Sequence, residues 1–421
     1  MKWMHVVERY ARFAEEFRRR PLPPEVTHHA RRAVIDWHAA WLAGAVVPPA
    51  TLLERAFADR KTSPRTAALI NGTAAHTVEV DDIFRDGIYH PGAPTIAAAH
   101  ALGFDGGNFL RAVVVGYEVS TRIGAAMGRA HYRYWHNTGT IGCFGAAAAC
   151  AELLELDAKR FAHALATVAT FAAGLQQAFR MDSMSKPLHA GRAAEAGLSA
   201  ALMAREGVTG SLDILEGEAG FGRAMGDNPD WERGLATLGR DFHITRMTFK
   251  NHACCGHTFA AIDGALELQR RMGIAAADIE EVEVATYRAG LEVAHYENPQ
   301  TPAEARFSLK YVVATALTHG NVRLAAFAPE RIADERTRSL MKKIHVSLAP
   351  DLDAAFPAHR AARVTINAKQ KKDRWLQPTR IGDPDAPLSD AALEAKYREL
   401  AAPVLGKSEA DKLLERLWRL Q

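Results

Sequence analysis

Hydrophobic residues recur at helical spacing along the first part of the chain. Val6, Tyr10, Phe13 and Phe17 lie three or four residues apart, as on one helix face, and the prolines after Leu22 end this run. We expect a second helix over residues 25–42. Later stretches rich in Ala and Gly, separated by short polar breaks, also predict helices: residues 66–76, 94–102, 108–127, 140–154 and 157–179, the last with Asp157 as its N-cap.

The pattern changes near Asp278. Polar and apolar residues alternate in three short stretches, as is typical of strands: residues 281–287, 343–348 and 363–368. Residues 305–319 and 329–342 read as helices, and the amphipathic stretch 389–420 is expected to pack back on the first helical region. The prediction is a mainly α protein with a large all-helical domain formed by both chain ends (residues 1–265 with 390–421) and a smaller α+β domain (266–389).

Composition narrows the possible partners. The net charge is +3, charges of both signs are spread along the chain, and no Lys/Arg-rich run is interleaved with aromatics, so nucleic acid is not an expected partner. No stretch approaches the roughly 18 apolar residues of a membrane helix, and the first residues lack the apolar core of a signal peptide. We therefore expect a cytoplasmic protein. Its four cysteines form no CxxC pair, which argues against a disulfide framework or a structural zinc site.

A long polar loop, residues 76–93, separates two predicted helices, and long ordered loops tend to be functional. Its adjacent acids, Asp81 and Asp82, cannot face the same way on a regular element, so we expect at most one of them in a pocket. His90 precedes Pro91, which favours an extended backbone. The alternative is an Asp cap with a surface histidine.

Two further polar stretches precede helices made of small residues. His136 lies in a turn before residue 140, and Lys186, His189 and Arg192 open the helix predicted over residues 193–204. Lys186 precedes Pro187, so we expect it outside the helix, with its side chain projecting from the helix start. A helix N-terminus with three basic side chains would suit a carboxylate-rich ligand. A packed aromatic loop and a solvated basic helix entrance are the alternatives.

The fourth polar stretch, residues 248–258, contains a His-x-Cys-Cys-x-His pattern that fits no standard metal site. Lys250 is the better chemical candidate, because a buried lysine shifts its pKa readily. Four such loops in one Ala-rich chain predict a shared acid–base pocket.

At these residues the sequence resembles the MmgE/PrpD family, which includes 2-methylcitrate dehydratase, cis-aconitate decarboxylase and iminodisuccinate epimerase. The resemblance is carried in chain order by segments that span nearly the whole sequence: residues 71–76, 81–82, 90–93, 185–192, 249–250, 254–255, 306–311 and 382–388. It departs from the dehydratase branch at Ile83-Phe84, where Thr-His is frequent, and at Phe259, where a histidine is common; here a histidine stands at His257.

The resemblance implies that the α+β domain acts as a lid, that the protein is a homodimer, and that catalysis needs no metal or organic cofactor. Carried over residue by residue, it assigns two sets of site residues. The catalytic set is Asp82, His90, His136, Lys186 and Lys250. The substrate-binding set is His189, Arg192, His257 and Tyr311.

The expected function is a cofactor-independent lyase acting on a di- or tricarboxylate, most simply a 2-methylcitrate dehydratase-like hydro-lyase. Cations would hold the substrate carboxylates and offset developing charge, while histidines or a desolvated lysine would move the proton. The same residues would support decarboxylation or epimerisation, as in an iminodisuccinate epimerase. A non-catalytic carboxylate binder is the alternative from another class.

Overall fold

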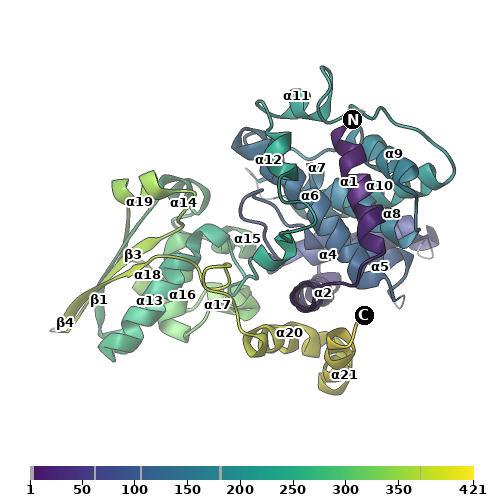
Figure 1. The fold of residues 1–421 in the computed structure, drawn as a ribbon. Coiled ribbons are helices and arrows are strands. Elements are labelled where there is room, and N and C mark those ends of the chain that lie inside the picture. Colours follow the sequence, from purple (N-terminus) through teal and green to yellow (C-terminus); the bar gives the residue numbers. More distant parts are fainter. Residues whose placement is uncertain (1–3, 61–62, 105–106, 180–182, 370) are drawn as a thin grey trace. The chain divides into compact units, whose positions relative to one another are not determined.

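The computed structural model describes residues 4–60, 63–104, 107–179, 183–369 and 371–421. The chain divides into two compact units: unit 1 holds Met1–Thr248 with Ser389–Gln421, and unit 2 holds Phe249–Leu388. The described residues are mainly helical, with a small sheet (Figure 1). The mainly α prediction is thereby confirmed.

All the helices and strands described in unit 1 are helices. Its α-helices are α1 Val6–Arg18, α2 Pro24–Ala45, α3 Ala50–Ala56, α4 Pro64–Thr77, α5 Gly92–Leu102, α6 Phe109–Tyr132, α7 Asn137–Thr140, α8 Gly142–Leu153, α9 Ala158–Ala169, α10 Ser185–Arg205, α11 Phe221–Met225, α12 Trp231–Leu235, α20 Asp390–Leu405 and α21 Lys407–Trp418. Its short 3-10 helices are η1 Ala58–Arg60, η2 Gln176–Phe179 and η3 His243–Arg246.

Helix α10 is the centre of unit 1 and packs against α4, α5, α8 and α9. Small residues let the backbones approach closely. A Cβ at Gly191 would lie 2.1 Å from the Leu69 carbonyl oxygen, and one at Gly197 would lie 2.5 Å from the Ala147 nitrogen. The C-terminal helix α20 packs on α2, as Figure 1 shows for these purple and yellow helices. The expected return of the chain end to the helical region is therefore confirmed within this unit.

Two helix predictions need correction. The stretch 157–179 is helical only to Ala169, although its cap is as predicted, with Asp157 accepting from the Arg160 N–H at 2.8 Å. Helix α10 begins at Ser185, eight residues earlier than expected, so the basic side chains lie on the helix itself. Met181 and Asp182, in the polar turn before it, lie outside the described residues.

Unit 2 packs helices on a small sheet. Its described α-helices are α13 Phe259–Met272, α14 Arg288–Val293, α15 Pro302–Arg306, α16 Leu309–His319, α17 Pro329–Ile332, α18 Glu335–Met341 and α19 Pro350–Ala355. Its 3-10 helices are η4 Gly256–Thr258, η5 Ala276–Asp278 and η6 Leu324–Phe327. Its strands are β1 Ile279–Thr286, β2 Ile344–Leu348, β3 Ala362–Ala368 and β4 Lys371–Gln377.

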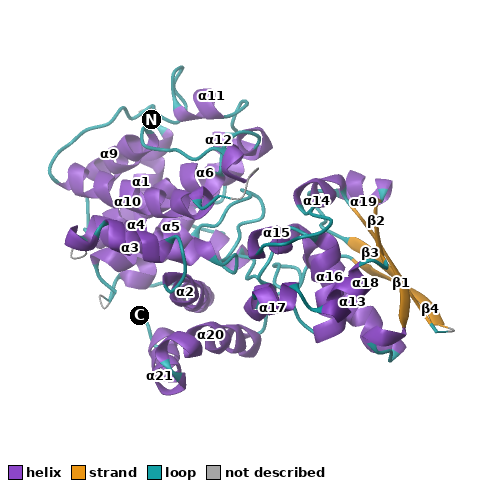
Figure 2. Ribbon diagram, turned by 180° about the vertical axis from the view of Figure 1, so that it is seen from behind, coloured by secondary structure: helices purple, strands orange, loops and turns teal. Residues whose placement is uncertain are grey.

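The described strands form one sheet in the order β2-β1-β3-β4, with β1 parallel to β2 and antiparallel to β3. Helices α13 and α16 contact the sheet and each other (Figure 2). The three predicted strands are confirmed. Strand β4 was not predicted; it pairs antiparallel with β3 and exposes most of its charged residues, as an edge strand does.

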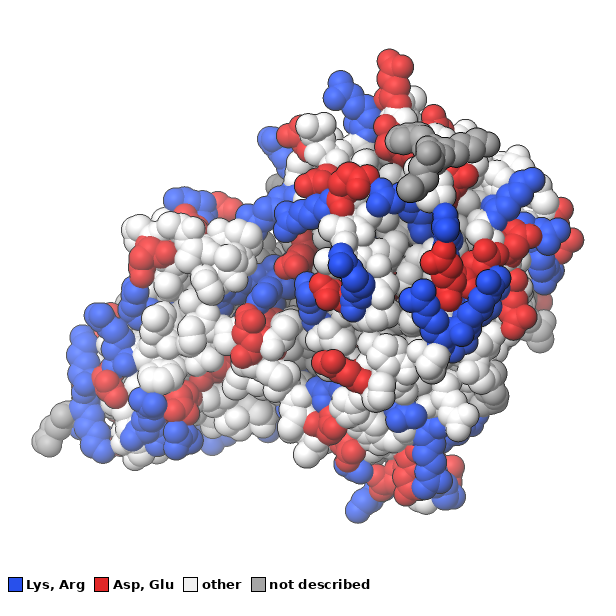
Figure 3. Space-filling view, in the orientation of Figure 1, with Lys and Arg blue, Asp and Glu red and all other residues white. Residues whose placement is uncertain are grey.

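The surface agrees with the mixed charge of the sequence. On the face drawn in Figure 3, basic and acidic side chains alternate over short distances and do not segregate by sign. Within the described residues, no helix combines the length and apolar character needed to span a bilayer.

Candidate active site

The loop between α4 and α5 is strained and nearly buried. Glu79 and Ile88 both have left-handed backbones, with φ values of 59° and 52°. Side chains rarely adopt this conformation, and the β-branched Ile88 is especially disfavoured in it. Each such residue costs about 1–3 kcal/mol, so the surrounding structure must hold the loop in place, and strain of this kind concentrates at functional sites.

The first restraint on the loop is Asp82. Its Oδ1 accepts from the Gly92 N–H at 3.0 Å and its Oδ2 accepts from the Tyr117 hydroxyl at 2.7 Å. A Cβ at Gly92 would lie 2.7 Å from the Tyr117 hydroxyl oxygen and 2.8 Å from Asp82 Oδ1, so only glycine fits there. Burial, helped by the negative charge of Asp36, raises the pKa of Asp82 to about 7.

The second restraint comes from the far end of the chain. The Lys396 ammonium, on α20, is buried and donates to Asp36 Oδ1 and to the Val80 carbonyl oxygen, both at 2.5 Å. The loop is therefore anchored by a residue more than three hundred positions away. The buried charge of Lys396 is balanced by Asp36.

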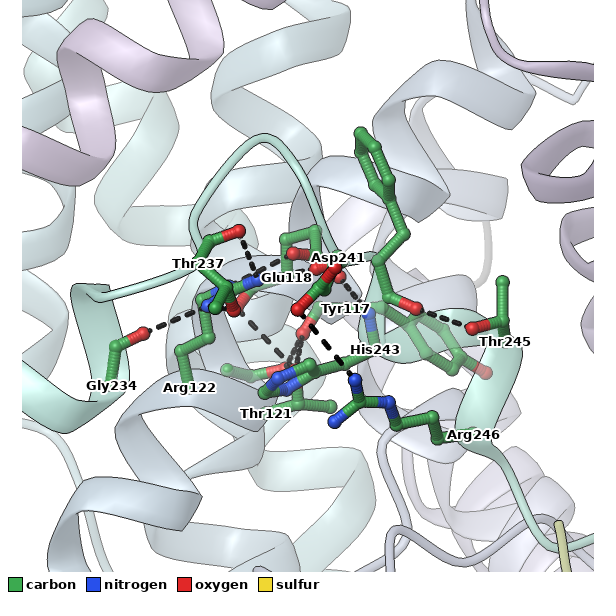
Figure 4. Close-up of polar contacts among 12 residues, drawn as sticks. Tyr117, Glu118, Thr121, Arg122, Gly234, Thr237, Asp241, His243, Thr245 and Arg246 are labelled. Atoms are coloured by element: carbon green, nitrogen blue, oxygen red, sulfur yellow. Dashed lines mark hydrogen bonds and ion pairs between the residues drawn. The ribbon is translucent and has the colours of Figure 1, made fainter.

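The third restraint is a polar network on α6 (Figure 4). Arg122 donates to Glu118 Oε2 at 2.9 Å, and Glu118 Oε1 accepts from the His243 N–H at 2.5 Å. The His243 ring stacks on Phe84, with centroids 5.3 Å apart. The network thus connects α6 to the loop through segment 234–246.

Ile83, Phe84 and Phe259, where the sequence departs from the dehydratase branch, are buried packing residues. Ile83 and Thr248 exchange two backbone hydrogen bonds at 2.9 Å. Phe259 packs edge-on against His252, with ring centroids 5.1 Å apart. In the described contacts these residues act in packing.

We use the term histidine cluster for His76, Asp81, His90, His136 and His189, all in unit 1. His76 Nδ1 lies 2.7 Å from Asp81 Oδ2, and His90 Nδ1 lies 3.2 Å from the same oxygen. One carboxylate oxygen therefore faces two imidazoles. The contact between His76 and Asp81 is a hydrogen bond and favours the hydrogen on His76 Nδ1, which leaves a lone pair on its Nε2. The contact of His90 with Asp81 is an ion-pair contact without hydrogen-bond geometry.

Asp81 is ionised, and the His76 imidazole beside it is neutral. Burial opposes the ionisation of Asp81, but His90 and His76 outweigh it and hold its pKa well below the usual range. Burial lowers the pKa of His76 to about 3, although Asp81 favours the protonated ring. At neutral pH, His76 is therefore a neutral imidazole hydrogen-bonded to a carboxylate.

The other half of the histidine cluster is a direct imidazole pair. His136 Nδ1 lies 3.0 Å from His189 Nδ1, and the His136 ring stacks on that of His76 at 5.4 Å. Burial, followed by the neighbouring imidazoles, holds the pKa of His136 well below its ordinary value. Burial and the nearby Lys186 charge lower the pKa of His189. Neutral imidazoles at this spacing can pass a proton between them.

Lys186 lies in the first turn of α10, so the prediction that it stands outside the helix is wrong. Its ammonium forms an ion pair with Glu79, the strained residue of the loop, and both side chains are mostly buried, at 17% and 10% exposed. Arg192 does not join this pair. It is exposed and forms an ion pair with Glu195.

The remaining predicted residues are in unit 2. Lys250 is buried. His257 Nδ1 lies 3.0 Å from the Tyr287 hydroxyl, and the buried Tyr311 donates to the Ala326 carbonyl at 2.5 Å. Tyr311 therefore has a structural contact in this unit.

The His-Cys-Cys-His pattern does not converge on one point. His252 Nε2 lies 2.8 Å from Asp263, while Cys254 Sγ lies 3.3 Å from the Thr258 hydroxyl. Among the described residues, potential metal ligands gather instead at His76, Asp81 and His90, whose ligand atoms lie within 4.8 Å of one another. This donor set would suit a divalent transition metal. The absence of a metal requirement stays a prediction.

Sequence reasoning placed Asp82 in the catalytic set, whereas the acid that contacts the histidines is Asp81. Asp82 binds Tyr117 and Gly92, whereas Asp81 contacts the imidazoles. It also overlooked His76 and Glu79. The sequence signal that could have identified His76 was its place near the end of a predicted helix, five residues before Asp81. The left-handed conformation of Glu79 has no sequence signal.

Two family models and several known proteins match this chain. Residues 8–234 match the MmgE/PrpD N-terminal domain, and residues 252–420 match the MmgE/PrpD C-terminal domain. The chain is 26% identical to the cis-aconitate decarboxylase-like protein oryM of Aspergillus oryzae, over 97% of this chain and 93% of that protein. It is 28% identical to cis-aconitate decarboxylase of Homo sapiens, over 85% of this chain and 76% of that protein. A shorter match, 33% identical over 92 residues, is to 2-methylcitrate dehydratase of Salmonella typhimurium and covers 21% of this chain and 19% of that protein. The chain belongs to the MmgE/PrpD family.

Proposed function

We propose that this protein is a lyase that breaks a bond at a carbon next to a carboxylate in a small di- or tricarboxylate, using side chains alone. The observation that carries the proposal is the Asp81 carboxylate shared by His76 and His90. A carboxylate on Nδ1 fixes the imidazole tautomer and stabilises the imidazolium that forms when Nε2 takes a proton.

His90 is the residue we assign to proton transfer with the substrate. Its side chain is 14% exposed, whereas that of His76 is fully buried. His136 and His189 then serve as the second proton-carrying pair. A base and an acid of this kind each contribute roughly 10²–10⁴-fold in rate.

Decarboxylation is the first reaction to test. The relatives that align over most of this chain carry the name cis-aconitate decarboxylase, which supports a carboxy-lyase. In such a reaction the bond to the leaving CO₂ supplies an electron pair, and an acid returns one proton to the carbon framework. We assign that step to His90, which lies against the Asp81 carboxylate.

Dehydration is the second candidate, supported by the 92-residue match to 2-methylcitrate dehydratase. Here a base removes a proton from carbon while an acid protonates the leaving hydroxyl. The two imidazole pairs of the histidine cluster supply one group for each task.

The test is to incubate the purified protein with cis-aconitate and, separately, with 2-methylcitrate in D₂O. CO₂ release with deuterium in the product would identify a decarboxylase, and alkene formation with loss of water a dehydratase. Exchange without either product would identify an epimerase. His90→Gln should abolish the reaction, while His295→Gln, at an exposed position, should leave it intact. A folded wild-type protein that binds these acids without exchange or turnover would make it a carboxylate binder and overturn the proposal.

A further inference from the structure

Unit 2 contains an arginine whose surroundings lack an acid. Arg306 is the last residue of α15, and it opens the 306–311 segment singled out in the sequence. Its carbonyl oxygen accepts from the Cys255 N–H at 3.0 Å, which fixes the backbone against the 254–255 segment. Its guanidinium carbon lies 5.1 Å from the centroid of the Phe327 ring. The side chain is therefore held in place by packing.

Among the described residues, no carboxylate oxygen lies within ion-pair distance of the Arg306 guanidinium, and its Nε is shielded from solvent without a hydrogen bond. Burial lowers the pKa of Arg306 to about 10, but the group is still charged at neutral pH. Arg306 as a whole is only partly buried, so a ligand can reach its guanidinium, while the shielded Nε keeps a donor that no group of the chain accepts.

Neighbouring groups do not supply the missing negative charge. The Cys254 thiol is buried, and its pKa is raised to about 12, so it is neutral. The other titratable groups that act on this thiol are Cys255 and Lys250, and neither is a carboxylate.

Arg380 in the same unit shows the ordinary arrangement. Its guanidinium is buried and bidentate on Asp383, with distances of 2.6 and 2.9 Å, and donates to the Gly256 carbonyl at 3.1 Å. The contrast is useful because both arginines lie in one unit and both approach the 255–256 segment. Arg380 has a carboxylate partner within the chain, whereas Arg306 has none among the described residues.

We propose that Arg306 is a carboxylate-binding residue, whose partner is a carboxylate of a small organic acid of the class named in the proposed function. This proposal rests on the proposed function in one respect, the chemical class of the ligand. A planar guanidinium binds a carboxylate through two parallel hydrogen bonds, which a lysine cannot reproduce. Lys186 and Arg192, the cations favoured by sequence, already form ion pairs with Glu79 and Glu195.

The experiment is calorimetric titration of the full-length protein with citrate, tricarballylate and succinate, alongside thermal melting. Arg306→Met should lower the affinity for the acid that binds wild type most tightly by about 10–100-fold, which is the usual loss when a charged hydrogen bond is removed. The melting temperature should stay level or rise. Arg306→Lys keeps the charge and should bind with intermediate affinity. Arg380→Met, the matched control, should lower the melting temperature because it removes both guanidinium hydrogen bonds from the buried Asp383 carboxylate.

Unchanged affinity in either Arg306 variant would overturn the proposal, as would a wild-type protein that binds none of the three acids. A fall in melting temperature as large as that of Arg380→Met, with binding retained, would make Arg306 a structural residue. If Arg306→Met does not fold, the affinity of Arg306→Lys decides the question. Failure of the proposed function would look different, because His90→Gln would then leave turnover unchanged whatever the Arg306 variants bind.

Discussion

Asp81 and Asp82 are neighbours in the chain, yet their carboxylates have opposite surroundings. Asp81 faces two imidazoles and has a pKa well below its usual range, whereas Asp82 faces a phenol and a backbone N–H and has a pKa of about 7. One carboxylate orients histidines, and the other ties the loop to α5 and α6. Their substitution should therefore have different consequences.

We expect Asp81→Asn to lower kcat by about 10²–10⁴-fold with little change in fold, because the amide cannot stabilise two imidazoles as an anion does. Asp82→Asn should instead mainly lower the melting temperature. The NH₂ group of the amide would face a hydrogen-bond donor, either the Tyr117 hydroxyl or the Gly92 N–H. Steady-state kinetics and melting curves of both variants test this. A larger activity loss in Asp82→Asn than in Asp81→Asn would return the catalytic role to Asp82.

The raised pKa of Asp82 predicts a pH-dependent stability. Between about 3.8 and 7 the folded protein holds a proton on Asp82 that the unfolded chain has released, so this residue's contribution to stability falls as pH rises through that window. The wild-type protein should therefore exceed Asp82→Asn in melting temperature by a larger margin at pH 5 than at pH 8. Melting temperatures of both proteins at the two pH values measure the difference, and a constant gap would contradict the assignment.

Lys186→Met tests the ion pair with Glu79. The substitution removes the ammonium from a mostly buried glutamate on a strained loop, so both kcat and the melting temperature should fall, the former by about 10²–10³-fold. The double variant Lys186→Met/Glu79→Gln should recover stability without recovering activity. If stability is unaffected by the single change, the pair does not hold the loop.

Lys396 offers a test far from the histidine cluster in sequence. Lys396→Met removes the anchor of the Val80 carbonyl and the ammonium that binds the buried Asp36, and we expect a loss of about 3–5 kcal/mol of unfolding free energy. Adding Asp36→Asn should restore part of the stability. Because Val80 stays unanchored, kcat should remain low in the double variant; wild-type kcat there would show that the anchor has no effect on catalysis.

Exhaustive dialysis against EDTA should leave activity unchanged, since acid–base chemistry by the histidine cluster requires no ion. Activity that disappears and returns with an added divalent metal would contradict this. Asp81 would then be the first candidate ligand, together with His76 and His90. A metal requirement that survived Asp81→Asn would exclude this group of ligands.

The sequence predicted what depends on local pattern. Alternation identified β1, β2 and β3, and Asp157 marked the start of α9. Strand β4 was missed because an edge strand does not need a buried face, and its lysines and arginine hide the alternation. The α10 start was placed late because Lys186, His189 and Arg192 were read as part of a polar turn before the helix, although Pro187 fits the first helical turn.

The candidate site was harder to predict because its geometry is tertiary. Neighbouring acids could be expected to diverge, but which of them meets the histidines depends on Tyr117 and Gly92. The backbone of Glu79 is held against its own preference by contacts elsewhere in unit 1. The extended conformation expected of Lys186 was wrong because helix α10 already includes it.

The anchor at Lys396 has a consequence for the order of events during synthesis. A chain leaves the ribosome from its N-terminus, so α2 and the strained loop emerge long before α20. Until unit 2 has been made and α20 follows it, Asp36 lacks its cation and the Val80 carbonyl lacks its donor. The final geometry of the loop is therefore reached late, after translation has passed through the whole of unit 2.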